Sequence, residues 1–371
     1  MKELREIYFS MQMTLFPMLE EEKIELSDKM KEFLRVIEVV QPARFLNSLL
    51  LWSGLGRPMI DRENIIRSFI LKSVYNLSST KMLIETLENS LNLCRLCGWE
   101  STRQVPSAAT FSRAFDVLAK TQLVSAMHEA VVSENYTDKL VGHSSTDSTE
   151  IIGREKACRI AEKKPKIKKK RGRKSKAEKE AAELAEIAEV DTPRLHVQAK
   201  RSLEENLADL PQGCDWGCKR NSKGKTECWC GYKFHITGGD GDVPLATVLT
   251  SASVHDSQVA IPMMQMTSQR VTYLYDLMDA AYDAGKIKEA SKMLGHVPII
   301  DPNPRRGEVI PLEPAMEKRY NERTSVERIN SNLKDNYGGR NVRVKGHWKV
   351  LCHLMFGILA ITVKQLFNML V

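Results

Sequence analysis

The stretch from Tyr320 to Lys334 reads YNERTSVERINSNLK and predicts an amphipathic helix. At about 100° per residue, an apolar stripe of Val326, Ile329 and Leu333 lines one side and can seat the helix on a core. The opposite side carries four polar residues: Tyr320, Arg323, Glu327 and Lys334. Because ordinary surface helices also place ion pairs four residues apart, the stretch alone leaves open a solvated helix and a functional one.

The composition is that of a globular protein with a polyanionic partner. The chain has 371 residues, 42% hydrophobic and 27% charged, enough for two domains or for one domain with an insertion. The net charge of +8 is unevenly spread, which indicates nucleic acid as a partner. The eight cysteines are too scattered for a disulfide framework, so we expect a reducing cytoplasm and access to the nucleoid.

Neither a signal peptide nor a membrane span is expected. The first residues, MKELREIYFSMQM, contain no small-residue cleavage site. The longest apolar run, Val350 to Val363, is shorter than the roughly 20 residues that a span needs. We expect this run to be a helix that packs against the sheet.

Residues 1–138 predict a helical N-terminal domain for DNA binding or oligomerisation. Several polar residues precede apolar periodic runs and are candidate helix starts: Ser27, Asp61, Ser78 or Ser79, and Ser107. Two of these helices form either a helix-turn-helix, with Ser112 and Arg113 facing DNA, or part of a plain helical bundle. Cys94 and Cys97 are expected to be small buried residues.

A mixed-sheet domain of the α+β or α/β class is expected over residues 139–338, interrupted by a long basic insertion over 153–226. Residues 163–173 read KKPKIKKKRGR, and five of these cations are candidate DNA contacts: Lys168, Lys169, Lys170, Arg171 and Arg173. Arg171-Gly172-Arg173 resembles the centre of an AT-hook but lacks the following proline, so a phosphate-binding arm is favoured. Residues 339–371 are expected to form a basic turn and the apolar helix.

Four cysteines lie near the end of the insertion: Cys214, Cys218, Cys228 and Cys230. Their spacing is awkward for a zinc knuckle, and zinc is not the favoured interpretation. Three aromatic residues interleaved with lysines favour a DNA-facing surface instead: Trp216, Trp229 and Tyr232.

Two acids stand at expected strand ends. Asp147 follows a β-rich run and has small hydroxyl neighbours, and Glu150 can point into the same space.

Further strands are expected over 231–236, 245–250, 271–278 and 297–300. Asp279 ends the third of these, where open sheets bind ligands, and Asp283 is expected to cap the next helix. With Glu327 on the helix, three carboxylates can meet, and oxygen ligands suit Mg²⁺ or Mn²⁺.

Taken together, these motifs resemble an insertion-sequence DDE transposase with an RNase H-like catalytic core. The strongest signal is Tyr320-x2-Arg323-x3-Glu327-x6-Lys334, which fits the YREK signature of that superfamily. The segments around Asp147 and Asp279 are similar to those that carry its first two acids.

The resemblance implies that Asp147, Asp279 and Glu327 hold two divalent metal ions for DNA cleavage and strand transfer. It also implies phosphate contacts by Arg323 and Lys334 and a contact of Tyr320 with the cut strand. Arg340 and Arg343 extend the basic surface. The implied partners are terminal inverted repeats and target DNA, bound by a homodimer.

Two alternatives remain beside the transposase: an RNase H-like nuclease without strand transfer, and a non-catalytic DNA-binding protein derived from a transposase. Relatives that use a hairpin intermediate carry a β-rich domain between the second acid and the glutamate. The interval from Asp279 to Glu327 is too short for such a domain, so the second-strand route stays open.

Overall fold

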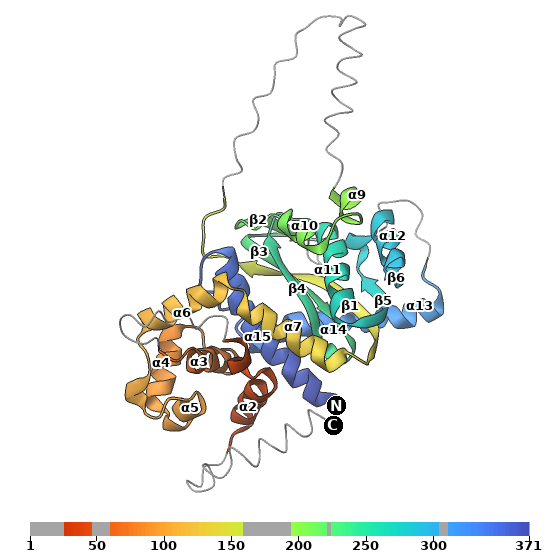
Figure 1. Cartoon of the computed structure of the whole chain (residues 1–371). Helices are drawn as coiled ribbons and strands as arrows, with labels where there is room; N and C mark the ends of the chain where they lie inside the picture. The colour runs from red at the N-terminus through yellow and green to blue at the C-terminus, as the bar shows by residue number, and fades with distance from the viewer. Residues whose placement is uncertain (1–25, 47–59, 159–193, 221–223, 304–310, 371) are drawn as a thin grey trace, which may run out of the picture.

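The computed structural model describes residues 26–46, 60–158, 194–220, 224–303 and 311–370 (Figure 1). Three sequence predictions lie outside these ranges: the nature of the N-terminal segment, the turn over 54–58, and the basic stretch. The candidate DNA contacts in that stretch are therefore not described: Lys168, Lys169, Lys170, Arg171 and Arg173.

Helices fill the described part of the N-terminal third, as predicted. They are α2 (Asp28–Val40), α3 (Arg62–Val74), α4 (Thr80–Asn89), α5 (Leu91–Leu96), α6 (Ala108–Lys120) and α7 (Leu123–Tyr136), with 3-10 turns η1 (Pro42–Phe45) and η2 (Thr102–Gln104). Three predicted caps are confirmed, because Ser27, Asp61 and Ser79 each accept a hydrogen bond from a backbone N–H in the first turn. The helix that follows Ser79 ends at Asn89, and Leu91 begins the next helix, α5.

A six-stranded mixed sheet forms the second half of the chain. Its strands are β1 (Leu140–Ile152), β2 (Asp215–Arg220), β3 (Thr226–Gly238), β4 (Pro244–Ser251), β5 (Thr272–Met278) and β6 (Val297–Ile300). The order is β2-β3-β1-β5-β6, and β4 also pairs with β3. β1 pairs antiparallel with β3 and parallel with β5, so the expected mixed sheet of an RNase H-like α+β domain is confirmed.

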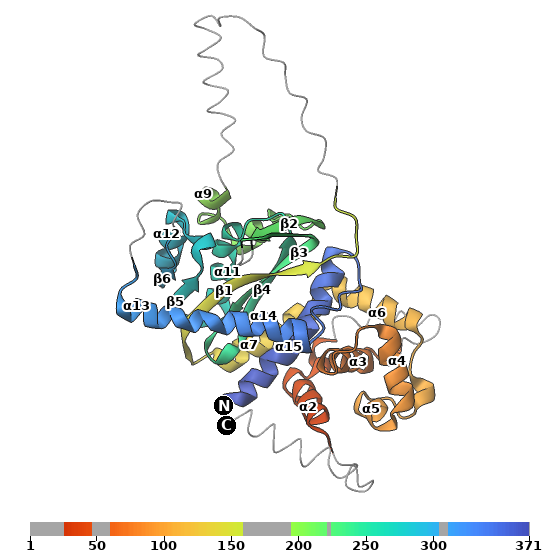
Figure 2. The same cartoon turned by 180° about the vertical axis from the view of Figure 1, so that it is seen from behind.

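Helices cover both faces of this sheet. Figure 1 shows α11 (Ser257–Arg270) in front of the strands, with α9 (Arg194–Gln198), α10 (Leu203–Ala208) and α12 (Gly285–Met293) nearby. Figure 2 shows α14 (Thr324–Asn336) across the opposite face. The predicted apolar stripe seats α14, since Val326, Ile329 and Leu333 are all buried.

The expected single helix from Tyr320 to Lys334 is divided. Tyr320 ends α13 (Pro314–Tyr320), and a 3-10 turn, η6 (Asn321–Arg323), leads into α14. The backbone stays in the right-handed helical region at Tyr320, Asn321, Arg323 and Thr324, so the two helices run on with one tight turn between them.

The apolar helix near the C-terminus, α15 (His347–Asn368), is longer than predicted and lies in the core. It packs against the N-terminal helices and against α14 and β4 (Figure 1). Among the described residues it alone is long and apolar enough to cross a bilayer by length and composition, and 83% of its most apolar window is buried. Gly357 lets α14 approach, because a Cβ there would lie 2.7 Å from Leu333 Cδ1.

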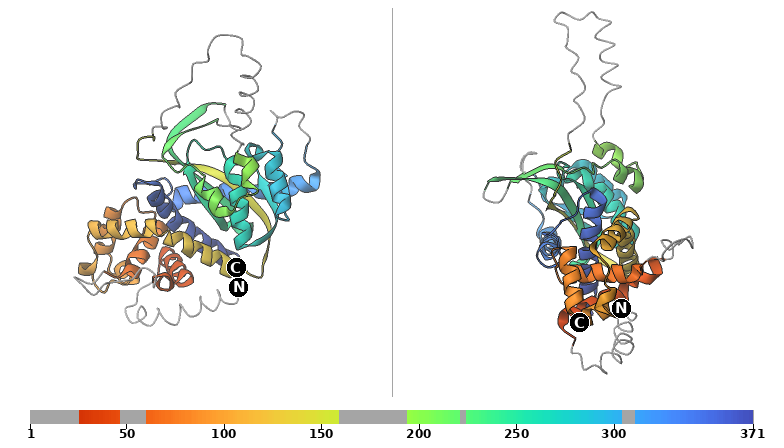
Figure 3. Two further views of the ribbon diagram at one scale, coloured as in Figure 1. Left: turned by 45° about the horizontal axis from the view of Figure 1, so that its top comes forward. Right: turned by 90° about the vertical axis from the view of Figure 1, so that its left-hand side faces the viewer.

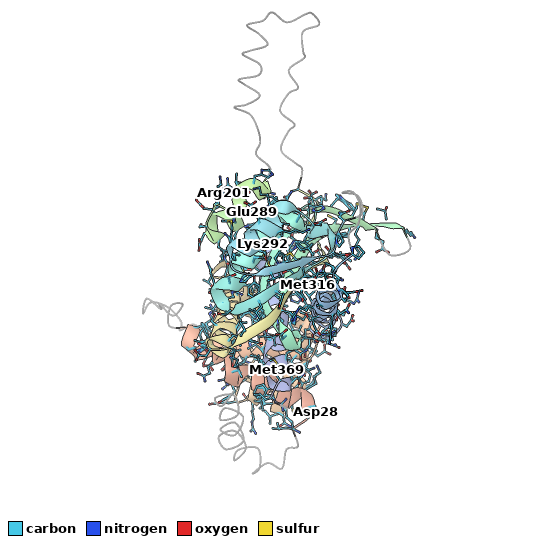
Figure 4. All side chains as sticks on the ribbon, turned by 90° about the vertical axis from the view of Figure 1, so that its right-hand side faces the viewer. Asp28, Arg201, Glu289, Lys292, Met316 and Met369 are labelled. Carbon is cyan, nitrogen blue, oxygen red and sulfur yellow. A yellow bond between two sulfur atoms is a disulfide. The ribbon has the colours of Figure 1, made fainter. Side chains whose placement is uncertain are left out.

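The C-terminal part of the predicted insertion over 153–226 contains regular structure, including one strand of the β2–β3 hairpin. Residues 194–220 contain α9, α10 and β2, and the hairpin projects from the body (Figures 3 and 4). Trp216 is 59% exposed, but Trp229 and Tyr232 are buried, so the predicted aromatic surface is wrong for two of its three residues.

The four hairpin cysteines are arranged in two pairs. Cys218 and Cys228 lie opposite each other and form a disulfide, which the scattered cysteine spacing did not predict. Cys214 Sγ lies 3.7 Å from Cys230 Sγ. Cys94 and Cys97 are buried as predicted.

Candidate active site

Asp147 lies in the middle of β1, which continues to Ile152, rather than at a strand end as predicted. Its Oδ2 accepts a hydrogen bond of 3.2 Å from Asn330 Nδ2 on α14. Burial raises the pKa of Asp147 to about 6, and the negative charges of Asp279 and Asp256 add to this, while the Ser148 backbone N–H and Arg323 oppose it. The site therefore disfavours a bare negative charge at this position.

Asp279 follows β5 directly, at the expected strand end. Its Oδ1 accepts a 2.9 Å hydrogen bond from the Ala281 backbone N–H. Because Thr146 pairs with Met278 in the parallel ladder, the next residues of the two strands, Asp147 and Asp279, lie side by side. Burial raises the pKa of Asp279 as well.

Glu327 does not join the two aspartates. Its Oε1 lies 2.5 Å from Arg323 Nη2, the ordinary i, i+4 pair that the sequence also allowed, and its side chain is 50% exposed. Arg323 also faces the aspartates, since its charge lowers the pKa of both Asp147 and Asp279. In place of the predicted cluster of three carboxylates, the structure has a pair of aspartates beside an arginine.

Lys334, expected to hold a phosphate, is engaged by a carboxylate. Its Nζ lies 2.6 Å from Glu150 Oε1, and Lys219 Nζ lies 2.6 Å from Glu150 Oε2. Burial alone would raise the pKa of Glu150, but the hydrogen bonds from Lys219 and Lys334 hold it at about 2. Glu150 thus faces two cations rather than the space beside Asp147 that the sequence suggested.

Asp256 also lies in this region, although the sequence did not predict a role for it. Its Oδ1 accepts hydrogen bonds of 3.0 Å from both Ser148 Oγ and Lys233 Nζ. Despite burial, the charges of His235 and Lys233 lower its pKa. The available signal was the His255-Asp256 pair placed directly before α11.

Two segments of the chain match known families. Residues 196–363 match the family model described as Transposase DDE domain, and residues 20–116 match the one described as Transposase domain (DUF772). The chain carries a transposase DDE domain. No curated protein and no solved structure matches the chain.

The DDE domain match contains Asp279 and Glu327 and begins after Asp147. Transposases of this family use divalent metal ions. Across the ranges that the structure describes, no group of three or more His, Cys, Asp or Glu side chains is arranged to hold one. The donor set nevertheless suits Mg²⁺, since Asp147 and Asp279 offer adjacent carboxylates and Glu327 lies on the helix that packs over β1.

The remaining predicted residues lie around this domain. Tyr320 is half-buried, with the Arg323 guanidinium 5.7 Å from its ring centroid. Arg340 pairs with Asp335 at 2.8 Å, and Arg343 is exposed on the turn after α14.

Two further aspartates have structural contacts. Asp283 does not cap α12 as predicted, because its Oδ1 pairs with Lys288 at 2.7 Å and its Oδ2 accepts from the Asn303 backbone N–H at 3.0 Å. Asp276, inside β5, is fully buried and accepts a 2.6 Å hydrogen bond from Ser291.

Proposed function

We propose that this transposase cleaves DNA at the ends of an insertion sequence and joins the ends to a target, with Asp147, Asp279 and Glu327 as ligands of two Mg²⁺ or Mn²⁺ ions. The observation that carries the proposal is the adjacency of two partly buried aspartates that lack a directly bonded lysine or arginine among the interactions described. Three acids nearby, Glu150, Asp256 and Glu327, each bond such a cation.

Cations at the aspartate pair offset the cost of keeping two adjacent, partly buried carboxylates charged. Bound Mg²⁺ supplies activation of the attacking oxygen and stabilisation of the leaving oxygen at phosphorus. Asn330 orients Asp147 through its 3.2 Å hydrogen bond, and Asp279 is fixed by the Ala281 N–H.

Glu327 reaches this pair by leaving Arg323, in one change of side-chain conformation on α14. Its half-exposed carboxylate meets little packing that would resist the change. The arginine freed in this way lies beside the aspartates and binds a DNA phosphate, which presents the same paired oxygens as a carboxylate. The Arg323–Glu327 pair is thus the resting arrangement of two functional groups.

The DNA partners are the terminal inverted repeats of the element and the target. We place the protein in the cytoplasm at the nucleoid, and we propose that a homodimer holds the two ends. The N-terminal helices, which match a transposase domain, contribute to DNA binding or to dimer contacts.

The test uses a labelled duplex that carries the DNA flanking the coding region. With Mg²⁺ we expect nicks at the repeat end and, with a target plasmid, joined products. Cleavage without joining would support the nuclease, and binding without cleavage would support the non-catalytic derivative. If Asp147→Asn or Glu327→Gln cleaves at the wild-type rate, the catalytic assignment is wrong.

A further inference from the structure

A carboxylate bridge connects three elements beside the aspartate pair. Glu150 on β1 accepts a 2.6 Å hydrogen bond from Lys334 on α14 at one oxygen and a 2.6 Å hydrogen bond from Lys219 on β2 at the other. The Lys334 side chain is only 13% exposed, whereas that of Lys219, near the turn end of the β2–β3 ladder, is 47% exposed. The bridge therefore faces solvent from the hairpin side.

The bridge has the chemistry of an occupied anion site. Two ammonium groups share one carboxylate, which leaves one unit of positive charge in excess. Glu150 stays ionised throughout the neutral range, since its two lysines hold its pKa at about 2 against burial. A phosphate group offers the same kind of charged oxygen acceptors as the carboxylate, with more oxygens to share between two donors.

The position of the bridge suits a DNA strand. Glu150 follows Asp147 by three residues on β1, which is roughly 10 Å at about 3.3 Å per strand residue. On α14, Asn330 contacts Asp147 and Lys334 contacts Glu150 one turn later. Side chains three residues apart on a strand start on opposite faces of the sheet, yet both acids meet α14. A DNA strand that follows this helix from Asp147 passes the bridge.

We propose that Lys219 and Lys334 bind one backbone phosphate of the DNA and that Glu150 occupies this phosphate site while the protein is free of DNA. The inference rests on the proposed function, because DNA at the aspartate pair is what brings the phosphate there. Charge complementarity identifies the occupant: a polyanion enters and displaces Glu150, whose side chain is already 29% exposed. Lys219 thereby becomes a DNA contact that the signature residues do not include.

Displacement of Glu150 has a consequence for selectivity. Any DNA must compete with an internal carboxylate, so the affinity of the protein for DNA is lower than its cations alone allow. A duplex that also fills the aspartate site offsets this cost, whereas unrelated DNA does not.

The experiment measures binding of a fluorescent duplex with the flanking sequence, and of an unrelated duplex, in EDTA at several salt concentrations. Glu150→Gln removes the competing charge, and we expect binding on the order of tenfold tighter at low salt. Lys219→Gln loses a phosphate contact, and we expect several-fold weaker binding with the salt slope reduced by about 0.9. When Lys219→Gln is already present, adding Glu150→Gln should tighten DNA binding less than it does in the wild-type protein.

A matched control is available on α12, where Lys286 and Glu289 form another exposed pair at 2.7 Å. Figure 4 labels Glu289 on the body, away from the projecting hairpin. Glu289→Gln should leave binding unchanged. Lys219→Arg keeps the charge and should bind as the wild type does.

A purely structural bridge gives the opposite pattern. Glu150→Gln would then lower the melting temperature and leave binding unchanged or weaker, and Lys219→Gln would keep the wild-type salt slope; either result overturns the inference. Magnesium-dependent cleavage by the wild type tests the proposed function separately. A protein that binds but does not cut refutes that function, and the variant comparison still decides on the bridge.

Discussion

Asp147 and Glu150 lie three residues apart on one strand, yet their surroundings have opposite effects. Burial and neighbouring acids raise the pKa of Asp147 to about 6, whereas two lysines hold that of Glu150 at about 2. The difference arises from the elements that face each carboxylate: Asp279 beside Asp147, and Lys334 with Lys219 around Glu150. Acids of the same strand thus have different surroundings: Glu150 is paired with two lysines, whereas Asp147 has the neighbouring acid expected of the proposed metal site.

The largest effect on this difference is expected when the charge of either aspartate, Asp147 or Asp279, is removed. Asp147→Asn or Asp279→Asn should lower the cleavage rate at least about 1,000-fold, since loss of metal binding removes roughly 4 kcal/mol of transition-state stabilisation. Binding in EDTA should persist, because neither side chain needs to contact DNA without metal. Cleavage rates and melting curves measured together check this, and an unfolded variant would show in the latter.

A second substitution tests the packing of α14, the helix whose side chains contact both carboxylates. In Gly357→Ala the new Cβ would lie 2.7 Å from Leu333 Cδ1 and from the Tyr337 carbonyl oxygen. We expect about 2 kcal/mol of destabilisation in urea unfolding, because the backbone at the C-cap of α14 cannot give way as a side-chain tip does. Gly285→Ala is the control, since no atom lies within 4 Å of its added Cβ. Equal stability of the two variants would contradict the close approach of α14.

Asn330 contacts only one of the two carboxylates, so replacing it tests them separately. Asn330→Ala removes the hydrogen bond to Asp147 but not the Lys334 contact to Glu150. We expect cleavage to fall about tenfold, the lower range for loss of an outer-shell partner, with unchanged salt dependence of binding. Asn332→Ala on the same helix should cleave normally, because Asn332 bonds only Asn336 among the hydrogen bonds described. A changed salt slope in Asn330→Ala would link the two sites.

The smallest effect concerns acid stability, which must be known before any pH profile of the site is interpreted. Burial lowers the pKa of both His128 and His353 to about 3, from about 6.5 when unfolded. The unfolded chain therefore binds more protons between these values, and stability falls as pH drops below 6.5.

From pH 7.5 to 5.5 each histidine should cost about 1.4 kcal/mol of unfolding free energy. His128→Gln should show the smaller pH dependence in urea unfolding, since glutamine can still donate to the Pro244 carbonyl that His128 bonds. His196→Gln at an exposed position of α9 is the control. A variant as acid-sensitive as the wild type would show that His128 titrates normally.

Local patterns predicted the elements well because their causes are local. Ser27, Asp61 and Ser79 cap helices through hydrogen bonds that span two or three residues. The apolar stripe of α14 and the acid after β5 follow from period and position along the chain. These features need no knowledge of distant segments.

The electrostatics of the site could not be predicted in the same way. Glu150 meets Lys219 and Lys334 across sequence separations of 69 and 184 residues. Asp256 meets Ser148 across 108 residues. Only the Arg323–Glu327 pair was visible in the sequence, and there the local interpretation competed with the catalytic one.

Because β1 pairs with a strand on each side, it limits which parts of the protein can move. Residues 145 and 146 pair with β3 on one side and with β5 on the other, so β1 cannot separate from the sheet here without disrupting two ladders. Deuterium should therefore enter β1 near Asp147 among the last of all backbone sites. The adaptations that accompany DNA capture must come from the side chains of α14 and from the outer hairpin, while the strand under Asp147 serves as the fixed reference.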